Sequence, residues 1–346
     1  MRALGFYEHS DTLDVLQVLE VPEPTPRPDE VVVQVHYAAL NRLDDWVRRG
    51  WKGLELAMPH ILGSDMAGEI VALGSEVSGW QVGERVVANP GIWCNRCEWC
   101  ERGEHSLCVE YGILGEHFPG VYAEYVAVPA RNLVRVPEGF PMEKAAAAPL
   151  VYLTAWRMLF TRAGLRAGER VLVVGAGGGV NSAAIQLAKM AGAFVYVAAG
   201  GPEKVQFARD LGADVVYDYR EQEWWKEVYR DTGKRGVDLV VDNVGEATFP
   251  YSLRALAKGG RVVTVGATTG SRSNADIRLI FWKQISIVGS TMGSQSEFRA
   301  AMRAVFEGRV DPPVDSIWPM EEYRQALERM LRGEQKGKIV LRINEG

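Results

Sequence analysis

Short apolar runs and amphipathic stretches alternate through the second half of the chain. From Arg170 onward, each apolar run has the length of a strand, and each stretch between two runs is long enough to form a helix. The predicted strands cover residues 171–174, 194–198, 214–219, 237–241, 261–265 and 285–288. Because neighbouring parallel strands need a crossover connection, this alternation predicts an α/β fold with a doubly wound parallel sheet of the Rossmann type.

The first 150 residues have a different pattern. Short alternating or apolar runs, such as residues 30–35 and 84–88, are interrupted by Pro and Gly, which predicts an irregular β-rich or barrel-like domain. After about Ser290 the strand–helix period is lost, and residues 337–341 indicate one more strand that returns to the first domain. We therefore assign residues 1–150 and 291–346 to a β-rich domain and residues 151–290 to an α/β domain.

Composition limits the function classes. The chain has 346 residues, is 47% hydrophobic and carries a net charge of −5 without a long basic run. It is long enough for two cores, and it offers neither nucleic acid nor an anionic membrane a basic face. The N-terminus lacks a signal-peptide pattern, and no apolar run approaches the roughly 20 residues of a membrane span. We expect a cytoplasmic protein whose partner is a small-molecule substrate.

A glycine loop follows the first predicted strand of the sheet. Residues 175–181 read Gly-Ala-Gly-Gly-Gly-Val-Asn and open a helix predicted over about 178–191. Glycines let backbone N–H groups approach a pyrophosphate at a helix N-terminus, so this loop predicts a dinucleotide site. The fingerprint departs from the usual one at its last position, which is Val180 or Asn181 depending on the glycine frame.

The end of the second predicted strand bears on the choice of cofactor. Residues 197–203 read Val-Ala-Ala-Gly-Gly-Pro-Glu, without the acidic residue that usually binds the adenosine ribose diol at the strand end. Lys204, and also Arg220 after the third strand, would attract a 2′-phosphate, which favours NADP(H) over NAD(H). The alternative is that both are solvated surface cations.

All four cysteines lie close together, at Cys94, Cys97, Cys100 and Cys108. This spacing lets one loop place four thiolates around a tetrahedral zinc ion. A closed four-thiolate site has no open position for substrate, so the zinc is expected to be structural. Disulfides or free thiols are the alternative in a chain without secretory features.

A second, catalytic zinc would need other ligands. The histidines, His9, His36, His60, His105 and His117, include no close pair. Each is interpreted as a packing or surface residue, with His117 kept as a candidate polar group of the active site.

Taken together, these features resemble the medium-chain dehydrogenase/reductase superfamily, with its zinc-type alcohol dehydrogenases and quinone oxidoreductases. The resemblance covers almost the whole chain. Besides the cysteine lobe, matching motifs lie at residues 120–125, 145–149, 154–156 and 242–245. It implies a GroES-like catalytic domain beside the Rossmann domain.

The resemblance also locates where catalytic zinc ligands would stand. The cysteine three residues before an aspartate is replaced by Asn41 before Asp44, and Gly-His-Glu is replaced by Gly63-Ser64-Asp65. The third ligand position falls near Leu150. This chain is thus similar to a hybrid of an alcohol dehydrogenase lobe and the zinc-free centre of a quinone oxidoreductase.

The resemblance further implies site residues. Asn41 and Thr154 are the predicted catalytic residues, with Asn41 contacting the substrate oxygen or, alternatively, capping a turn. Lys338 would reach the pyrophosphate, Thr154 the nicotinamide and Tyr219 the adenosine. The remaining predicted cofactor-binding residues are Ala176, Gly177, Gly178, Gly179, Val180, Ala199, Gly200, Lys204, Asn243, Gly266, Ala267, Ser290 and Thr291.

Without a metal Lewis acid, a conjugated acceptor is easier to reduce than a plain ketone, because it disperses the developing charge. The main hypothesis is therefore hydride transfer from NADPH to a quinone, enone or enal. Three alternatives remain: an alcohol or aldehyde dehydrogenase with a metal held by Asp44, Asp65 or a histidine; an acryloyl-CoA-type enoyl-thioester reductase; and a non-enzymatic NADPH-binding protein. The resemblance implies that residues 285–288 form the edge strand at which the superfamily assembles. Because an unpaired apolar edge invites a partner, we expect a homodimer or homotetramer.

Overall fold

The computed structural model describes residues 1–344 and divides them into two compact units. Within the described chain, the first unit contains residues 1–150, 293–308 and 312–344, and the second contains residues 151–292 and 309–311. The boundary between residues 292 and 293 lies two residues from the expected boundary at 290/291. The short segment 309–311 was expected in the first unit but belongs to the second. Each unit has its own hydrophobic cluster.

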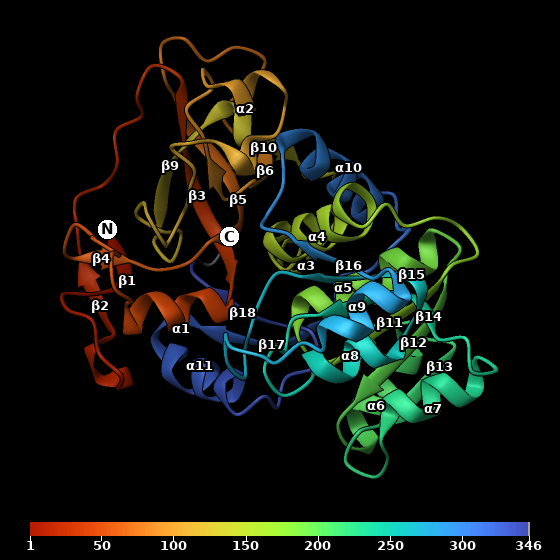
Figure 1. The fold of residues 1–346 in the computed structure, drawn as a ribbon. Helices are drawn as coiled ribbons and strands as arrows, with labels where there is room; N and C mark the ends of the chain where they lie inside the picture. The colour runs from red at the N-terminus through yellow and green to blue at the C-terminus, as the bar shows by residue number, and fades with distance from the viewer. Residues whose placement is uncertain (345–346) are drawn as a thin grey trace. The chain divides into compact units, whose positions relative to one another are not determined.

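The second unit is built on a six-stranded sheet in which every neighbouring pair is parallel. Its strands are β11 (Arg170–Val174), β12 (Phe194–Ala199), β13 (Val215–Asp218), β14 (Val237–Asp242), β15 (Leu256–Thr264) and β16 (Ser286–Gly289). The order β13-β12-β11-β14-β15-β16 reverses direction between β11 and β14 (Figure 1). The predicted doubly wound parallel fold is confirmed.

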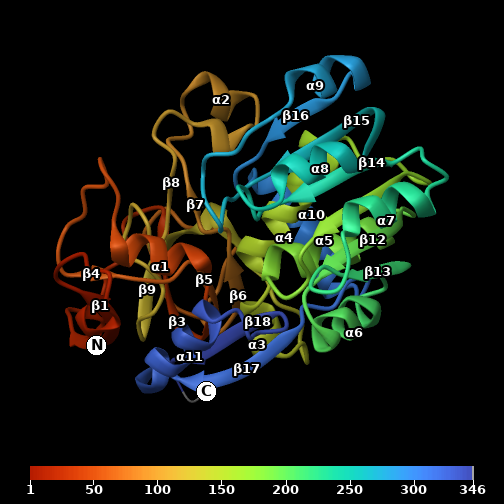
Figure 2. The same ribbon diagram turned by 60° about the horizontal axis from the view of Figure 1, so that its bottom comes forward.

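Helices connect these strands and cover the sheet. They are α5 (Gly179–Met190), α6 (Pro202–Asp210), α7 (Trp224–Asp231), α8 (Phe249–Ala255) and α9 (Ile277–Lys283), preceded by α4 (Pro149–Trp156) and the π-helix η4 (Arg157–Arg162). Helices α7, α8 and α9 contact one another in series, and α8 also contacts β14 and β15 (Figure 2). Leu172 and Val174 of β11 share a buried cluster with Trp224 and Val228 of α7, because alternate strand residues point to one face.

The first unit is rich in irregular β structure, as the sequence predicts. Its larger sheet has the order β10-β6-β5-β3-β18-β17, with β9 also paired to β3. These strands are β3 (Glu30–Ala39), β5 (Asp65–Leu73), β6 (Arg85–Ala88), β9 (Tyr125–Pro129), β10 (Leu133–Arg135), β17 (Val314–Pro319) and β18 (Lys338–Arg342). The C-terminal strand β18 lies antiparallel to β3, with Val340 opposite Ala39. This pairing places the start of β18 beside the end of β3.

The remaining elements of the first unit surround this sheet. The smaller strands are β1 (Arg2–Phe6), β2 (Gln17–Glu20), β4 (His60–Ile61), β7 (Gly91–Ile92) and β8 (Gly112–Ile113). The helices are α1 (Arg42–Arg49), α2 (Glu98–Glu101), α3 (Met142–Ala146), α10 (Gln295–Phe306) and α11 (Tyr323–Leu331), with 3₁₀ turns η1 (Leu13–Val15), η2 (His105–Leu107), η3 (Ala130–Asn132) and η5 (Met320–Glu322). Helix α1 begins directly after β3 through a capping box of Asn41 and Asp44.

Candidate active site and cofactor site

The glycine loop connects β11 to the N-terminus of α5. Gly175 has φ of +97°, a conformation that glycine adopts without strain, and Gly178 is the N-cap of α5. A Cβ on Gly178 would meet nothing within 4 Å, so the backbone is open to a ligand there. Because the first N–H groups of a helix lack intrahelical partners, this end of α5 suits a pyrophosphate.

Asn181 has a structural role that the sequence did not indicate. Its Nδ2 donates to the Val174 carbonyl at 2.8 Å, and its Oδ1 accepts from Asn243 Nδ2 at 2.9 Å. Asn243 Oδ1 in turn accepts from the Val265 N–H at 3.0 Å. The two amides therefore join the carboxyl ends of β11, β14 and β15, where ligands bind in open α/β sheets. At the last position of the glycine fingerprint, this chain therefore has Asn181 in place of a small residue, and its side chain links these strand ends by hydrogen bonds.

Two predicted residues meet at the end of β12. A Cβ on Gly200 would overlap the Tyr219 phenol, so only glycine lets that ring approach the strand end. Gly201 has φ of +85°, and a Cβ there would lie 2.9 Å from Arg220 Nη1. Asp218 holds this turn, since its Oδ1 accepts from the N–H groups of Gly201 and Arg220 at 3.0 and 2.9 Å. These two hydrogen bonds lower the pKa of Asp218.

Lys204 belongs to the same corner. Burial lowers the pKa of Lys204, and the positive charge of Arg220 lowers it further, which indicates that the two cations face one region. The structure therefore brings Gly200, Lys204, Tyr219 and Arg220 together. The sequence alone left both Lys204 and Arg220 open as solvated surface cations.

Thr154 lies on α4 and is buried, with 2% of its surface exposed. Its hydroxyl donates to Met292 Sδ at 3.7 Å, and Met292 has a positive φ of 45°. The predicted residues Gly266 and Ala267 follow β15, and Ser290 and Thr291 follow β16. Ser290 Oγ is buried and has no hydrogen-bond partner within residues 1–344. These positions stay predictions as cofactor contacts.

The four cysteine sulfurs gather at one point. One ligand atom from each lies within 4.8 Å of all the others, and Sγ of Cys100 is 3.9 Å from that of Cys94 and 3.6 Å from that of Cys97. A tetrahedral zinc with Zn–S bonds of about 2.3 Å needs sulfur–sulfur distances of about 3.8 Å. Cys108 Sγ also accepts the Cys94 N–H at 3.3 Å. The donor set and spacing fit one zinc ion.

The thiols differ in their acidity without a metal. Hydrogen bonds, above all from the Cys100 N–H, lower the pKa of Cys97 to about 6, whereas burial raises the pKa of Cys100 to about 12. A metal that binds all four as thiolates therefore displaces a proton at Cys100.

The lobe is held by aromatic and polar contacts. His105 stacks on Trp93 with centroids 4.3 Å apart, and His105 Nδ1 accepts the N–H of Gln295 at the start of α10. Burial lowers the pKa of His105. This histidine is thus a packing residue, as the sequence analysis interprets it.

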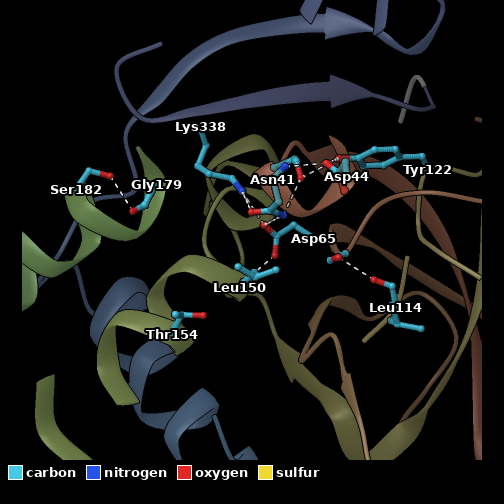
Figure 3. A network of polar contacts seen from close by, with 12 residues as sticks. Asn41, Asp44, Asp65, Leu114, Tyr122, Leu150, Thr154, Gly179, Ser182 and Lys338 are labelled. Atoms are coloured by element: carbon cyan, nitrogen blue, oxygen red, sulfur yellow. Dashed lines mark hydrogen bonds and ion pairs between the residues drawn. The ribbon is translucent and has the colours of Figure 1, made fainter. Parts of the chain in front are cut away.

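A buried polar network lies where β3, β5 and β18 meet, and Figure 3 shows its members pointing toward one another. Lys338 Nζ donates to Asn41 Oδ1 at 2.6 Å and to Asp65 Oδ2 at 2.9 Å. Asn41 Nδ2 donates to Asp65 Oδ2 at 2.9 Å. Asp65 Oδ1 accepts the Leu150 N–H at 2.7 Å. The three side chains form a closed triangle around an ion pair.

Asp44 extends the network toward Tyr122. Asp44 Oδ2 accepts from the Asn41 N–H and from the Tyr122 hydroxyl, both at 2.7 Å. Complete burial raises the pKa of Asp44 to about 7, although these two hydrogen bonds and Lys338 oppose the rise. Burial likewise raises the pKa of Tyr122.

The network does not fit a second metal. Ser64, at the expected histidine position, donates to the Leu114 carbonyl at 2.7 Å, and Leu150 offers only an apolar side chain. Both Asp65 oxygens are already taken by donors. His60 pairs with the Gly115 carbonyl, and His117 lies beside Glu116. Within residues 1–344 the cysteine cluster is the one group with metal-binding geometry.

Asn41 lies in the network as the N-cap of α1, which agrees with its alternative role of capping a turn, and its predicted contact with a substrate oxygen stays a prediction. The structure also places Lys338 in the network. The predicted contact of Lys338 with a pyrophosphate stays a prediction. Sequence reasoning missed the role of Tyr122 and of Asn181. The only sequence signal for Tyr122 was its place in the motif at residues 120–125.

Comparisons with known proteins now identify the class. The family described as alcohol dehydrogenase GroES-like domain matches residues 27–138, and the family described as zinc-binding dehydrogenase matches residues 179–307. An NAD-dependent alcohol dehydrogenase of Saccharolobus solfataricus is 33% identical, covering 94% of this chain and 96% of that protein. The chain therefore belongs to the medium-chain dehydrogenase/reductase superfamily.

Further relatives are named as reductases and dehydrogenases. An acryloyl-coenzyme A reductase of Sulfurisphaera tokodaii is 31% identical over 93% of this chain and 95% of that protein. A crystal structure of an NAD-dependent alcohol dehydrogenase superposes with a TM-score of 0.96 and 43% identity, covering 99% of this chain and 100% of the other. The protein is an oxidoreductase of this superfamily that uses a nicotinamide cofactor. No helix within residues 1–344 is long and apolar enough to cross a membrane.

Proposed function

We propose that the protein reduces activated acceptors, such as enones, enals or quinones, with NADPH and without a catalytic metal. The observation that carries the proposal is the Asn41–Lys338–Asp65 triangle. At the positions where the superfamily resemblance expects zinc ligands, this chain has an amide, a serine hydroxyl bound to a backbone carbonyl, and a leucine.

The preference for NADPH is supported by the corner around Gly200 and Gly201. Arg220 lies beside Gly201, its positive charge lowers the pKa of Lys204 on α6, and β12 ends in Ala199 without an acidic side chain. A 2′-phosphate would receive charge-assisted hydrogen bonds from both cations. Several relatives are named as NAD-dependent enzymes, so the cofactor has to be tested on this chain.

The four cysteines are proposed to hold one structural zinc. All four sulfurs face a single point, so the ion would have no open position for substrate. Its role would be to fold residues 94–108, which contain only short elements.

The bound cofactor would supply the hydride, and the chain's own residues would hold the acceptor and its developing charge. A conjugated acceptor spreads that charge over several atoms, so donors weaker than a metal ion suffice. The buried network offers such donors, held by hydrogen bonds in a fixed arrangement.

A reductase of unsaturated acyl thioesters is the second candidate. Such an enzyme adds hydride to a conjugated double bond in the same way, but the carbonyl belongs to a thioester. Relatives named acryloyl-coenzyme A reductase and crotonyl-CoA carboxylase/reductase favour this candidate. We further propose a homo-oligomer in the cytoplasm, where reduced thiols persist.

The test is turnover of a panel that contains an enone, an enal, a quinone, acryloyl-CoA, a plain ketone and a plain alcohol, each with NADPH and NADH. Zinc content is measured on the same preparation. We expect reduction of conjugated acceptors and one zinc per chain. Oxidation of the plain alcohol that depends on a second metal ion would contradict the proposal, and so would tight NADPH binding without any turnover.

A further inference from the structure

The buried network limits which of its groups is able to donate a hydrogen bond to a substrate. Asn41 has two amide hydrogens, and its Nδ2 already donates to Asp65 Oδ2 and to the Ala39 carbonyl, at 2.9 and 3.3 Å. The orientation of this amide is fixed by chemistry, because an ammonium only donates and the atom facing Lys338 Nζ must be the oxygen. Asn41 therefore has no donor left for a substrate oxygen.

The hydroxyl donors of the other network members also have acceptors within the protein. Tyr122 has one hydroxyl hydrogen, which points to Asp44 Oδ2 and Ala39 O, and the Ser64 hydroxyl donates to Leu114 O. Ionised Asp65 is an acceptor only. Lys338 differs: its ammonium has three hydrogens, and two acceptors face it within residues 1–344.

The fold places this ammonium where it is. Lys338 is the first residue of β18, and the antiparallel pairing of β18 with β3 puts it beside Asn41, the second residue after the end of β3 at Ala39. The Lys338 side chain is 4% exposed and that of Asp65 is fully buried, so their ion pair is shielded from water. In such surroundings a charged donor stabilises an anion far more than it does in solvent.

We propose that Lys338 is a catalytic residue whose third N–H binds the oxyanion formed on the acceptor, and that Asp65 and Asn41 are positioning residues that aim it. This inference rests on the proposed reduction of conjugated acceptors. When hydride adds to the β-carbon of an enone, the C=C electron pair moves so that the carbonyl oxygen becomes negative. Lys338 donates a hydrogen bond to that oxygen. Water then gives a proton to the α-carbon, and the hydroxide left behind takes a proton from the solvent. The saturated product is complete and the lysine stays protonated.

The first test needs no turnover. 4-Nitrophenol is titrated into the zinc-loaded, full-length protein with NADP⁺ bound, and absorbance reports how much of the bound probe is phenolate. We expect the wild type to bind the phenolate in preference to the phenol, and Lys338→Met to bind the phenolate roughly 10- to 100-fold more weakly. The control is Lys226→Met, which removes an exposed lysine on α7 whose partner is Glu223. The control should retain the preference.

The second test separates catalysis from cofactor binding. With an enone as acceptor, Lys338→Met should lower kcat roughly 100-fold, while the Kd of NADPH, measured by fluorescence, changes less than about twofold. Lys338→Arg should recover part of kcat, since it restores a cationic donor.

Lys338→Met leaves the Asp65 carboxylate buried without its partner, which destabilises the fold. If this variant does not fold, the double variant Lys338→Met/Asp65→Asn provides a neutral pair for the same two measurements. Lys338→Asn in the same background is unsuitable, because its shorter side chain leaves a cavity.

Two results would overturn the inference. One is an unchanged phenolate affinity in the folded variant, or no phenolate preference in the wild type. The other is a Kd for NADPH that rises tenfold or more while kcat at saturating NADPH is retained, because Lys338 would then bind the cofactor pyrophosphate. A wild type that reduces none of the acceptors would contradict the proposed function but not the inference about Lys338, because the phenolate titration tests that inference without turnover.

Discussion

Lys338 Nζ lies 2.6 Å from Asn41 Oδ1, a contact between residues 297 positions apart. It joins the start of the last strand to the second residue after the longest strand of the same sheet, and Asp65 closes the triangle. An ammonium, an amide and a carboxylate thus occupy one buried point. This arrangement explains how a member of a superfamily with zinc-dependent enzymes presents a positive charge without metal ligands at that point.

Arg220 and Lys204 should decide the choice of cofactor. Arg220→Ala is expected to raise the KM for NADPH roughly 10- to 100-fold, because a charge-assisted contact with the 2′-phosphate is lost, and to leave the KM for NADH within about twofold. Lys204→Ala should act in the same direction. Steady-state kinetics with both cofactors check this. Lys226→Ala, on the exposed side of α7, is the control. If Arg220→Ala or Lys204→Ala changed the KM for NADPH and for NADH equally, the assignment of these cations to the 2′-phosphate would be contradicted.

The cysteine lobe should lose its zinc when one ligand is removed. Cys97→Ser is expected to reduce zinc from one per chain to less than about a tenth and to lower Tm by about 10 °C, because closing the lobe depends on the metal. Metal analysis and thermal unfolding measure the two effects. Since these four cysteines are all that the chain has, a thiol-reactive dye counts the ligands directly. Four rapidly reacting thiols in the native wild type would contradict a bound zinc.

Asp44 should make stability depend on pH with an unusual sign. Its pKa is raised from 3.8 to about 7 in the folded chain, so between these values the folded chain keeps a proton that the unfolded chain has lost. Stability therefore falls as pH rises from about 4 to 7, and the loss is complete above pH 7. Asp44→Asn lacks this loss, so its Tm relative to the wild type should rise by several °C between pH 5 and pH 8.

Asp238→Asn is the matched control for that pH series. Burial raises the pKa of Asp238, but the hydrogen bonds from Arg235 and Arg170 lower it more, and the net shift is downward. Its ionised form therefore stabilises the fold, and removing it should cost stability at pH 8 as at pH 5. Parallel Tm profiles for Asp44→Asn and the wild type would show that Asp44 is not protonated in the folded state.

The edge of the six-stranded sheet should be an interface between copies of the chain. Strand β16 lies at the edge, and its Ile287 is 48% exposed. On the preceding helix α9, Phe281 and Trp282 are 62% and 73% exposed. An unpaired strand edge beside exposed apolar side chains favours pairing with a second copy.

Trp282→Glu and Ile287→Lys are expected to shift the protein toward the monomer, measured by light scattering after size-exclusion chromatography. The control is Val109→Glu, next to the last cysteine, where an apolar side chain is also 72% exposed but belongs to no strand. A wild type that is monomeric at micromolar concentration would rule out this interface.

The sequence predicted the parallel sheet well because periodicity is a local property. All six expected strands form, and the helix expected over about 178–191 spans Gly179–Met190. The cysteine cluster was also predictable, since fifteen consecutive residues contain all four cysteines. Arg220 was harder: its distance from Gly201 depends on the pairing of β12 with β13, which a local pattern does not report.

What the sequence determined by itself was therefore the class: strand and helix periods, a glycine loop after a strand and a metal-binding spacing. The resemblance to the superfamily added that Asn41, Ser64 and a residue near Leu150 stand where zinc ligands would be. Only the tertiary structure decided which side chain lies where the zinc ligands would be with a hydrogen-bond donor to spare. Asn41, Asp65 and Lys338 come from three strands or their ends, and their hydrogen bonds exist only once β18 pairs with β3 and β3 pairs with β5. Hydrogen bonding is directional and short-ranged, so the donor available to a substrate follows from three-dimensional partners rather than from residue type.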